Sequence, residues 1–155
     1  MIKTRIAALA LALSFLSATI SFAANPHMGT WKLNESKSKI PAGMNKNMTV
    51  VYSEQKDQMK VVVDGIGKNG KPIHGVWIGK ADGKAYKSQG NLPWDAASYK
   101  TVNDRSYEIT TMKGGKIYSQ GRSEISADGK TRTVNTSGTT EDGKKFKTMS
   151  VYDRG

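Results

Sequence analysis

The sequence predicts an all-β protein in which about ten antiparallel strands form an up-and-down meander that closes into a barrel. Pairs of turn residues ending in Gly recur at 69–70, 82–83, 114–115, 128–129 and 142–143, and such pairs favour the tight turns of β-hairpins. Between the turns, apolar residues alternate with polar ones at the strand period of two, and no interval after residue 23 shows the period of an amphipathic helix. A closed barrel also removes the exposed edges that a flat sheet of this size would keep.

The expected strands follow from this alternation and from the turns between them. The first begins at Gly29, where Trp31 and Leu33 alternate with polar neighbours and so define one buried and one exposed face. The full set, in chain order, is 29–34, 47–54, 58–65, 71–79, 84–89, 97–102, 105–112, 116–125, 130–138 and 145–153.

Two joints interrupt the meander. In 35–46, Pro41 and Gly43 oppose even a single helix. In 90–95, Pro93 excludes a central strand, and Trp94 next to it covers either a barrel mouth or a hydrophobic edge.

Residues 1–23 have the pattern of a secretory signal peptide. Lys3 and Arg5 precede an apolar run at 6–20, and small residues at Ser21 and Ala23 predict cleavage after Ala23. The alternative is a buried core helix over 6–20. We therefore expect a single β-barrel domain at 24–155, periplasmic or secreted, with no transmembrane span after processing. The chain has no Cys, so no disulfide framework supports the fold.

The chain is strongly basic, with 24 Lys and Arg against 13 Asp and Glu. The signal carries two of the basic residues, which leaves 22 against 13 and a net charge of +9. Export argues against a nucleic-acid partner, although basic proteins often have one. Anionic envelope components are the alternative partners, and scattered lysines also keep strand edges from aggregating.

Alternation assigns most inward faces. Strand 71–79 is ambiguous, because Ile73 and Trp77 lie on one parity while His74, Val76 and Ile78 lie on the other. The inward residues predicted elsewhere are Met59, Val61 and Val63 in the third strand, Tyr107 and Ile109 in the seventh, and Ile117 and Ile125 in the eighth.

Small inward residues at Ser119, Gly121 and Ser123 would leave space inside a barrel of this size. The sequence therefore predicts a cavity with an apolar wall and a few hydroxyls, which is typical of a site for a small hydrophobic or amphipathic ligand. The alternative is a flattened sheet whose tyrosines pack as ordinary core. The candidate ligand-binding residues are Tyr52, Val61, Val63, Trp77, Tyr99, Tyr107, Ile109, Arg132 and Tyr152.

Arg132 is the candidate for a charged anchor. Val134 is the only large apolar residue in 130–138, so if Val134 faces inward then Arg132 and Thr136 do too. A buried guanidinium needs an anionic partner, and a ligand carboxylate would supply one. A solvent-facing Arg132 is the alternative.

Gly29, Trp31 and the last strand carry a family resemblance. Gly-x-Trp near the mature N-terminus resembles the opening strand of the lipocalin and fatty-acid-binding protein group, the calycin-like β-barrels, whose tryptophan plugs one barrel end. Tyr152 aligns with the tyrosine of the carboxylate-holding Arg-x-Tyr of fatty-acid-binding proteins, while the arginine position is Ser150. The resemblance to lipocalins implies that Arg154 stacks on Trp31 as a structural cation–π contact.

The motif order over the mature chain is also similar to a mostly uncharacterised group of small exported bacterial proteins. The segments that carry this similarity are Gly-Thr-Trp-Lys-Leu-Asn, Gly-Lys-Pro-Ile-His, Ser-Ala-Asp-Gly-Lys-Thr and Val-Tyr-Asp-Arg. The similarity implies the fold and the compartment and assigns no activity.

The sequence lacks the usual constellations of catalytic chemistry, so we expect no enzyme, metal or cofactor. The only histidines are His27, placed in a mobile N-terminal lead, and His74, placed on a strand as a surface or half-buried residue. Asp64, Glu108 and Glu124 fall on the outward face, which leaves no inward carboxylate pair.

The leading hypothesis is a monomeric, non-catalytic, exported barrel that binds a small lipid-like ligand, with Arg132 or Tyr152 as polar anchor. The alternative is a filled barrel that acts through its basic surface as an envelope-associated interaction or inhibitor protein.

Overall fold

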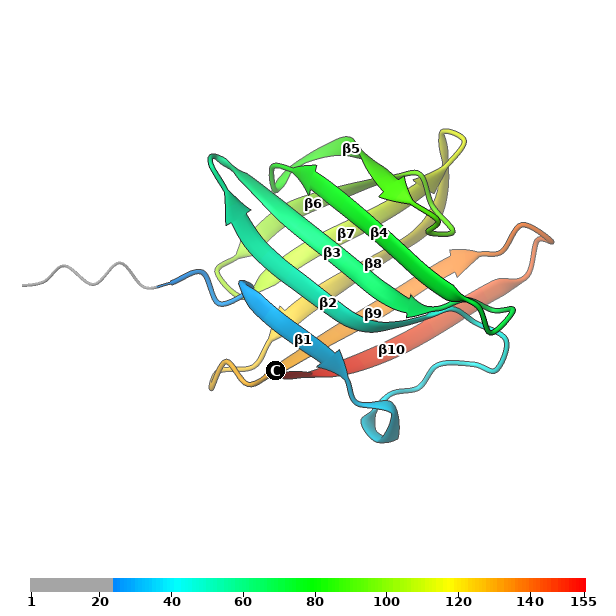
Figure 1. Ribbon diagram of the computed structural model, residues 1–155, viewed down its shortest axis with the longest axis horizontal. Coiled ribbons are helices and arrows are strands. Elements are labelled where there is room, and N and C mark those ends of the chain that lie inside the picture. Colours follow the sequence, from blue (N-terminus) through cyan, green and yellow to red (C-terminus); the bar gives the residue numbers. More distant parts are fainter. Residues whose placement is uncertain (1–23) are drawn as a thin grey trace, which may run out of the picture.

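The computed structural model describes residues 24–155, which form a closed barrel of ten antiparallel strands in meander order (Figure 1). The predicted signal peptide, 1–23, lies outside the described residues. The strands are β1 (Gly29–Leu33), β2 (Lys46–Gln55), β3 (Gln58–Ile66), β4 (Pro72–Gly79), β5 (Asp82–Gly90), β6 (Ala96–Asn103), β7 (Ser106–Lys113), β8 (Lys116–Ile125), β9 (Thr131–Thr139) and β10 (Lys145–Arg154). The all-β meander predicted from the turn pairs is confirmed, and each strand lies within two residues of its expected bounds.

Pairing of the first strand with the last closes the barrel. β1 lies between β2 and β10, with Trp31 opposite Arg154 and Leu33 opposite Tyr152 in the register with β10. Each strand therefore has two hydrogen-bonded neighbours, so the sheet exposes no full edge to another chain.

The joint between β1 and β2 contains one short 3₁₀ helix, η1 (Glu35–Lys37), and no α-helix, as Pro41 and Gly43 predicted. Asn34 caps η1 by accepting a hydrogen bond from the Lys37 amide. Lys39 then pairs with Met149 of β10, with N···O distances of 2.7 and 2.9 Å. This joint is thereby held against the barrel wall. Within residues 24–155 we find no helix with the length and apolar character needed to cross a membrane.

Among strands that follow one another in the chain, β4 and β5 pair over the fewest residues. Their register covers only Gly75, Val76 and Trp77 of β4. Gly90 lies opposite Gly75 with a φ of 104°, and a Cβ at Gly90 would lie 2.1 Å from the His74 carbonyl oxygen. The close approach of the two strands here depends on a residue without a side chain.

In most strands, the residues that face the interior are those that the alternation of the sequence predicted. Met59, Val61 and Val63 are buried, and Ile73 and Trp77 form the buried parity of the ambiguous strand. Ile117 was expected to face inward, and this prediction is wrong, since its side chain is 59% exposed.

A β-bulge in β8 explains the exposure of Ile117. Thr111 pairs with Ser119, whereas the next residue, Met112, pairs with Ile117. Tyr118 is therefore an extra residue in β8, and an extra residue reverses the facing of the strand beyond it. The regular alternation from 119 to 125 thus does not extend to Ile117.

The N-terminal segment 25–28 leads into β1 at the left-hand end of the barrel in Figure 1, and its side chains plug that end. His27 was expected in a mobile lead, but this prediction is wrong, because its ring is 1% exposed and stacks on Tyr107 at 3.8 Å. Trp31 is fully buried and donates its Nε1 hydrogen to the His27 carbonyl oxygen at 2.9 Å. Asn25 donates to the Tyr107 hydroxyl at 3.3 Å.

Arg154 completes this plug from β10. Its guanidinium carbon lies 4.2 Å from the centre of the Trp31 ring, where the resemblance to lipocalins placed it. The same guanidinium donates to the carbonyl oxygens of Pro26, Met28 and Gly129, each at 2.7 Å. A Cβ at Gly29 would lie 2.7 Å from Arg154 Nη1, so Gly29 makes room for this side chain.

Candidate ligand-binding cavity

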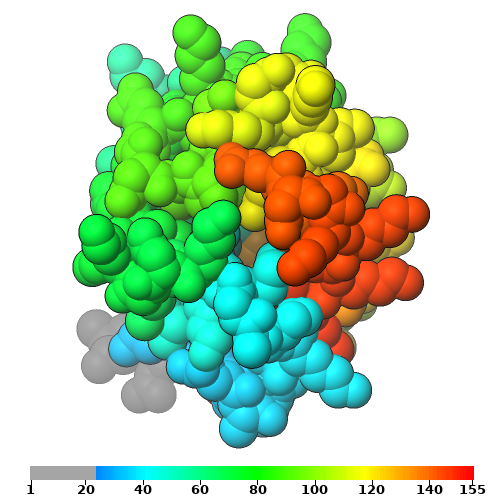
Figure 2. Space-filling model, turned by 90° about the vertical axis from the view of Figure 1, so that its right-hand side faces the viewer, coloured from blue at the N-terminus to red at the C-terminus, as the bar shows by residue number. Residues whose placement is uncertain are grey.

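The other end of the barrel is hollow. Figure 2 looks onto this end and shows a depression between the cyan segment before β2 and the orange turn between β9 and β10. It leads to a cavity of about 140 Å³. The mouth is bordered by side chains from the two joints and from the strands below them: Ile40, Met44, Asn45, Trp94, Tyr118 and Phe146.

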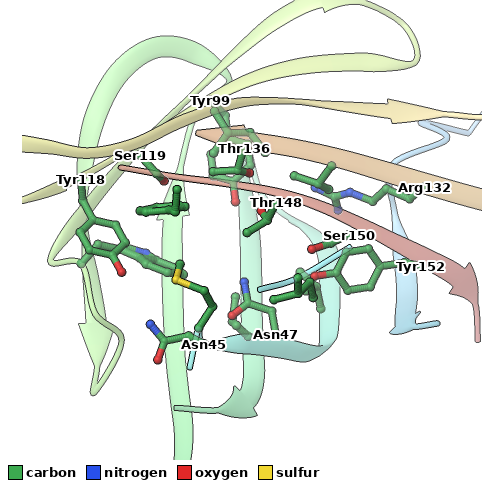
Figure 3. Close-up of a pocket in the computed structure, with 18 of the residues that line it drawn as sticks. Asn45, Asn47, Tyr99, Tyr118, Ser119, Arg132, Thr136, Thr148, Ser150 and Tyr152 are labelled. Carbon is green, nitrogen blue, oxygen red and sulfur yellow. The ribbon is translucent and has the colours of Figure 1, made fainter. Parts of the chain in front are cut away.

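Arg132 marks the deep end of the cavity. It extends from β9, near Ser150 and Tyr152 of β10, while Tyr118 and Asn45 lie at the opposite end (Figure 3). The Arg132 side chain is 2% exposed. The alternation of this strand predicted that Arg132 and Thr136 face inward if Val134 does. All three residues line the cavity.

The partners of Arg132 are neutral. Its Nε donates to Ser123 Oγ at 2.8 Å, and its Nη2 donates to the Tyr52 hydroxyl. The guanidinium carbon lies 4.0 Å from the centre of the Tyr52 ring, a cation–π contact. Nη1 is buried and has no hydrogen-bond partner among the described residues. The guanidinium thus keeps one donor group free for another molecule.

No carboxylate balances this charge within residues 24–155. The ion pairs there join solvent-exposed side chains, and none involves Arg132. Burial raises the pKa of Tyr152 to about 12 and holds the pKa of Tyr99 well above its ordinary value. Both hydroxyls are therefore neutral at pH 7. An uncompensated buried charge costs several kcal/mol, so the deep end favours an anionic group.

The wall between the two ends is apolar with interspersed hydroxyls. Val63 and Ile109 contribute aliphatic surface, and Thr148 and Ser150 of β10 contribute hydroxyls. At the mouth the aromatic rings form a chain, with centroids 6.4 Å apart for Trp94 and Tyr118, and 5.9 Å apart for Tyr118 and Phe146. A ligand with an apolar body and a polar end would therefore contact surface of matching polarity along its whole length.

Of the nine candidate ligand-binding residues, six line this cavity and three do not. Those that line it are Tyr52, Val63, Tyr99, Ile109, Arg132 and Tyr152.

Val61, Trp77 and Tyr107 lie instead in packed core. Trp77 is held by a 2.9 Å hydrogen bond to the Ala97 carbonyl oxygen, and its ring packs against Tyr99 at 4.6 Å. Tyr107 is covered by the stacked His27 ring. Val61 is almost completely buried. Inward parity alone does not separate residues that line a cavity from residues that fill the core.

Sequence reasoning missed most of the mouth. Phe146, Thr148 and Ser150 share the parity of Tyr152, so the alternation of the last strand contained their signal. Tyr118 lines the cavity because of the bulge in β8, and a bulge leaves no simple pattern in the sequence. A second register shift, between Asn47 and Thr49, accompanies the inward position of Asn47.

The described residues contain no cluster of three or more His, Cys, Asp or Glu that would hold a metal ion. Asp64, Glu108 and Glu124 are exposed, as their parity predicted. His74 faces solvent, and its Nδ1 lies 2.6 Å from Asp64 Oδ1.

Neither a family model nor a curated protein sequence matches the chain. Similar solved structures include the redesigned β-barrel mFAP1 bound to DFHBI, with 19% identity over 85% of this chain and 98% of that chain and a TM-score of 0.45. The redesigned β-barrel b11L5F_LGL has 17% identity over 86% of this chain and 95% of that chain, with a TM-score of 0.46. EF1p2_mFAP2b bound to DFHBI has 14% identity over 86% and 97%, with a TM-score of 0.47.

Proposed function

We propose that this protein is an exported, monomeric barrel that binds a small hydrophobic or amphipathic ligand in its interior and catalyses no reaction. The observation that carries the proposal is the cavity, which joins an apolar and aromatic wall to one buried, partly unpartnered guanidinium at Arg132. Binding sites for small molecules typically combine a largely apolar wall with a few convergent polar groups. Arg132 and Tyr152 are the polar anchors, and Tyr52, Val63, Tyr99 and Ile109 supply contact surface.

Export to the periplasm or beyond is proposed from the sequence. The pattern of residues 1–23, with two basic residues, an apolar run and small residues at a cleavage site, supports it. Membership in the calycin-like group, and in the group of small exported bacterial proteins, is proposed on the Gly29, Trp31 and Arg154 arrangement and on the motif order described above.

A filled barrel that acts through its basic surface is the alternative. A cavity with Trp94 at its mouth favours the ligand-binding function over it. Reversing the charge of exposed lysines separates the two functions, because it abolishes association with anionic envelope material under the alternative and leaves ligand uptake intact under the proposal.

A paired tryptophan substitution tests the proposal. Ile109→Trp places a large ring in the cavity wall, whereas Ile117→Trp places the same ring on the exposed face of the next strand. With a panel of fluorescent lipids and apolar dyes, we expect uptake of at least one member by the wild-type protein and the Ile117 variant, and loss of that uptake in the Ile109 variant. If circular dichroism shows that both variants are folded, equal uptake by the two would show that ligands bind elsewhere.

A further inference from the structure

We propose that the cavity selects small monoanions, carboxylates above all, whose apolar body is about the size of one ring, and that it excludes long acyl chains. This inference rests on the proposed function and specifies its ligand class. Two independent observations carry it: the unpaired charge at the deep end and the volume of the space.

The charge argument begins with what Arg132 lacks. Its contacts are a serine hydroxyl, a tyrosine hydroxyl and a tyrosine ring, all neutral, and its buried Nη1 has no partner. A carboxylate oxygen at Nη1 would form a charge-assisted hydrogen bond and supply the missing counter-charge. A neutral amide or alcohol would supply only an acceptor and leave the charge uncompensated.

The surroundings favour one negative charge and no more. Arg132 is the only basic side chain among the cavity-lining residues. A dianion such as a phosphate monoester would bring a second charge into a wall made of apolar side chains and hydroxyls, at a desolvation cost that nothing there offsets.

The volume argument limits the body of the ligand. An apolar protein cavity of about 150 Å³ accommodates benzene, and the cavity here measures about 140 Å³. One ring with a short acid side chain fits between Arg132 and the mouth, whereas a long acyl chain would extend out past Trp94 and Tyr118 into solvent. The aromatic side chains at the mouth favour edge-to-face contacts with such a ring.

Isothermal titration calorimetry of the wild-type protein with two near-isosteric probes tests the inference. We expect 3-phenylpropanoate to bind about tenfold or more tightly than 3-phenylpropanamide, because charge-assisted hydrogen bonds are about twice as strong as neutral ones. Palmitate is expected to bind more weakly than 3-phenylpropanoate. Equal binding of the acid and the amide overturns the charge selection, and tighter binding of palmitate overturns the size limit.

Variants assign the preference to Arg132. Arg132→Met replaces the guanidinium with a shorter, uncharged and unbranched side chain, and we expect the acid and the amide to bind this variant equally. Arg122→Met is the matched control, since Arg122 is exposed on β8 and pairs with Glu124 at 3.0 Å, and we expect it to keep the full preference. The same preference in both variants would overturn the role of Arg132. Should neither probe nor any member of the fluorescent panel bind, the proposed function fails as well, whereas dye uptake without acid preference refutes the inference alone.

Discussion

The buried imidazole of His27 makes the stability of the barrel depend on pH. Burial, together with the nearby positive charge of Arg132, lowers the pKa of His27 from 6.5 to about 4. In the unfolded chain His27 takes up a proton near pH 6.5, whereas in the folded protein it stays neutral down to about pH 4. Acidification through this window therefore favours the unfolded state, and the stability is fully present above pH 6.5.

The size of the effect follows from the shift. One pKa unit corresponds to about 1.4 kcal/mol, so the difference between 6.5 and about 4 corresponds to about 3 kcal/mol. For a domain of this length, that is about 10 °C in melting temperature. The ring is stacked on Tyr107, and the charge that acts on it is that of Arg132, which opposes protonation.

Thermal or urea unfolding between pH 4 and pH 7 checks this prediction when the wild-type protein is compared with His27→Phe. Phenylalanine keeps the stack on Tyr107 and cannot titrate, so the variant should lack the loss of about 3 kcal/mol. Carboxylates that titrate in the same range contribute equally to both proteins and cancel in the difference. Parallel curves for the wild-type protein and His27→Phe would refute the burial of a neutral imidazole.

Three further outcomes are expected. Arg154→Met should lower the free energy of unfolding by about 2 kcal/mol in urea titrations, since it removes three hydrogen bonds to carbonyl oxygens and a cation–π contact; a loss no larger than that of exposed Arg122→Met would contradict this. Gly90→Ala should destabilise the barrel far more than Gly70→Ala, because a Cβ meets a carbonyl oxygen 2.1 Å away at the first site and nothing within 4 Å at the second. Tyr152→Phe should leave the ultraviolet absorbance titration around about pH 10 unchanged, because burial raises the pKa of Tyr152 to about 12; a reduced amplitude there would show that the hydroxyl is accessible to solvent.

The fold was predictable from the sequence because its signals are local. The turn pairs ending in Gly fix where each hairpin reverses, and period-two alternation then places residues such as Val61 and Val63 on the inner face. Ile117 was assigned to the wrong face because the bulge at Tyr118 depends on the pairing of β7 with β8, which is not local.

The candidate site was predictable only in part. Val134 gave the correct parity for Arg132, and hence the charged end of the cavity. The burial of His27 was missed because it depends on docking of the N-terminal segment over Tyr107, which no alternation pattern records. Trp77 and Tyr107 were candidates for the ligand site, yet they fill the core, because the position of a void depends on how all the facing side chains pack together.

Native mass spectrometry of the protein, purified without denaturation and followed by solvent extraction, tests most directly whether the barrel carries a small ligand. We expect a discrete added mass of metabolite size that is absent from Ile109→Trp and present in Ile117→Trp. A bare mass in all three proteins, together with no uptake from the fluorescent panel, would contradict a ligand-binding barrel and direct attention to its lysine-rich surface.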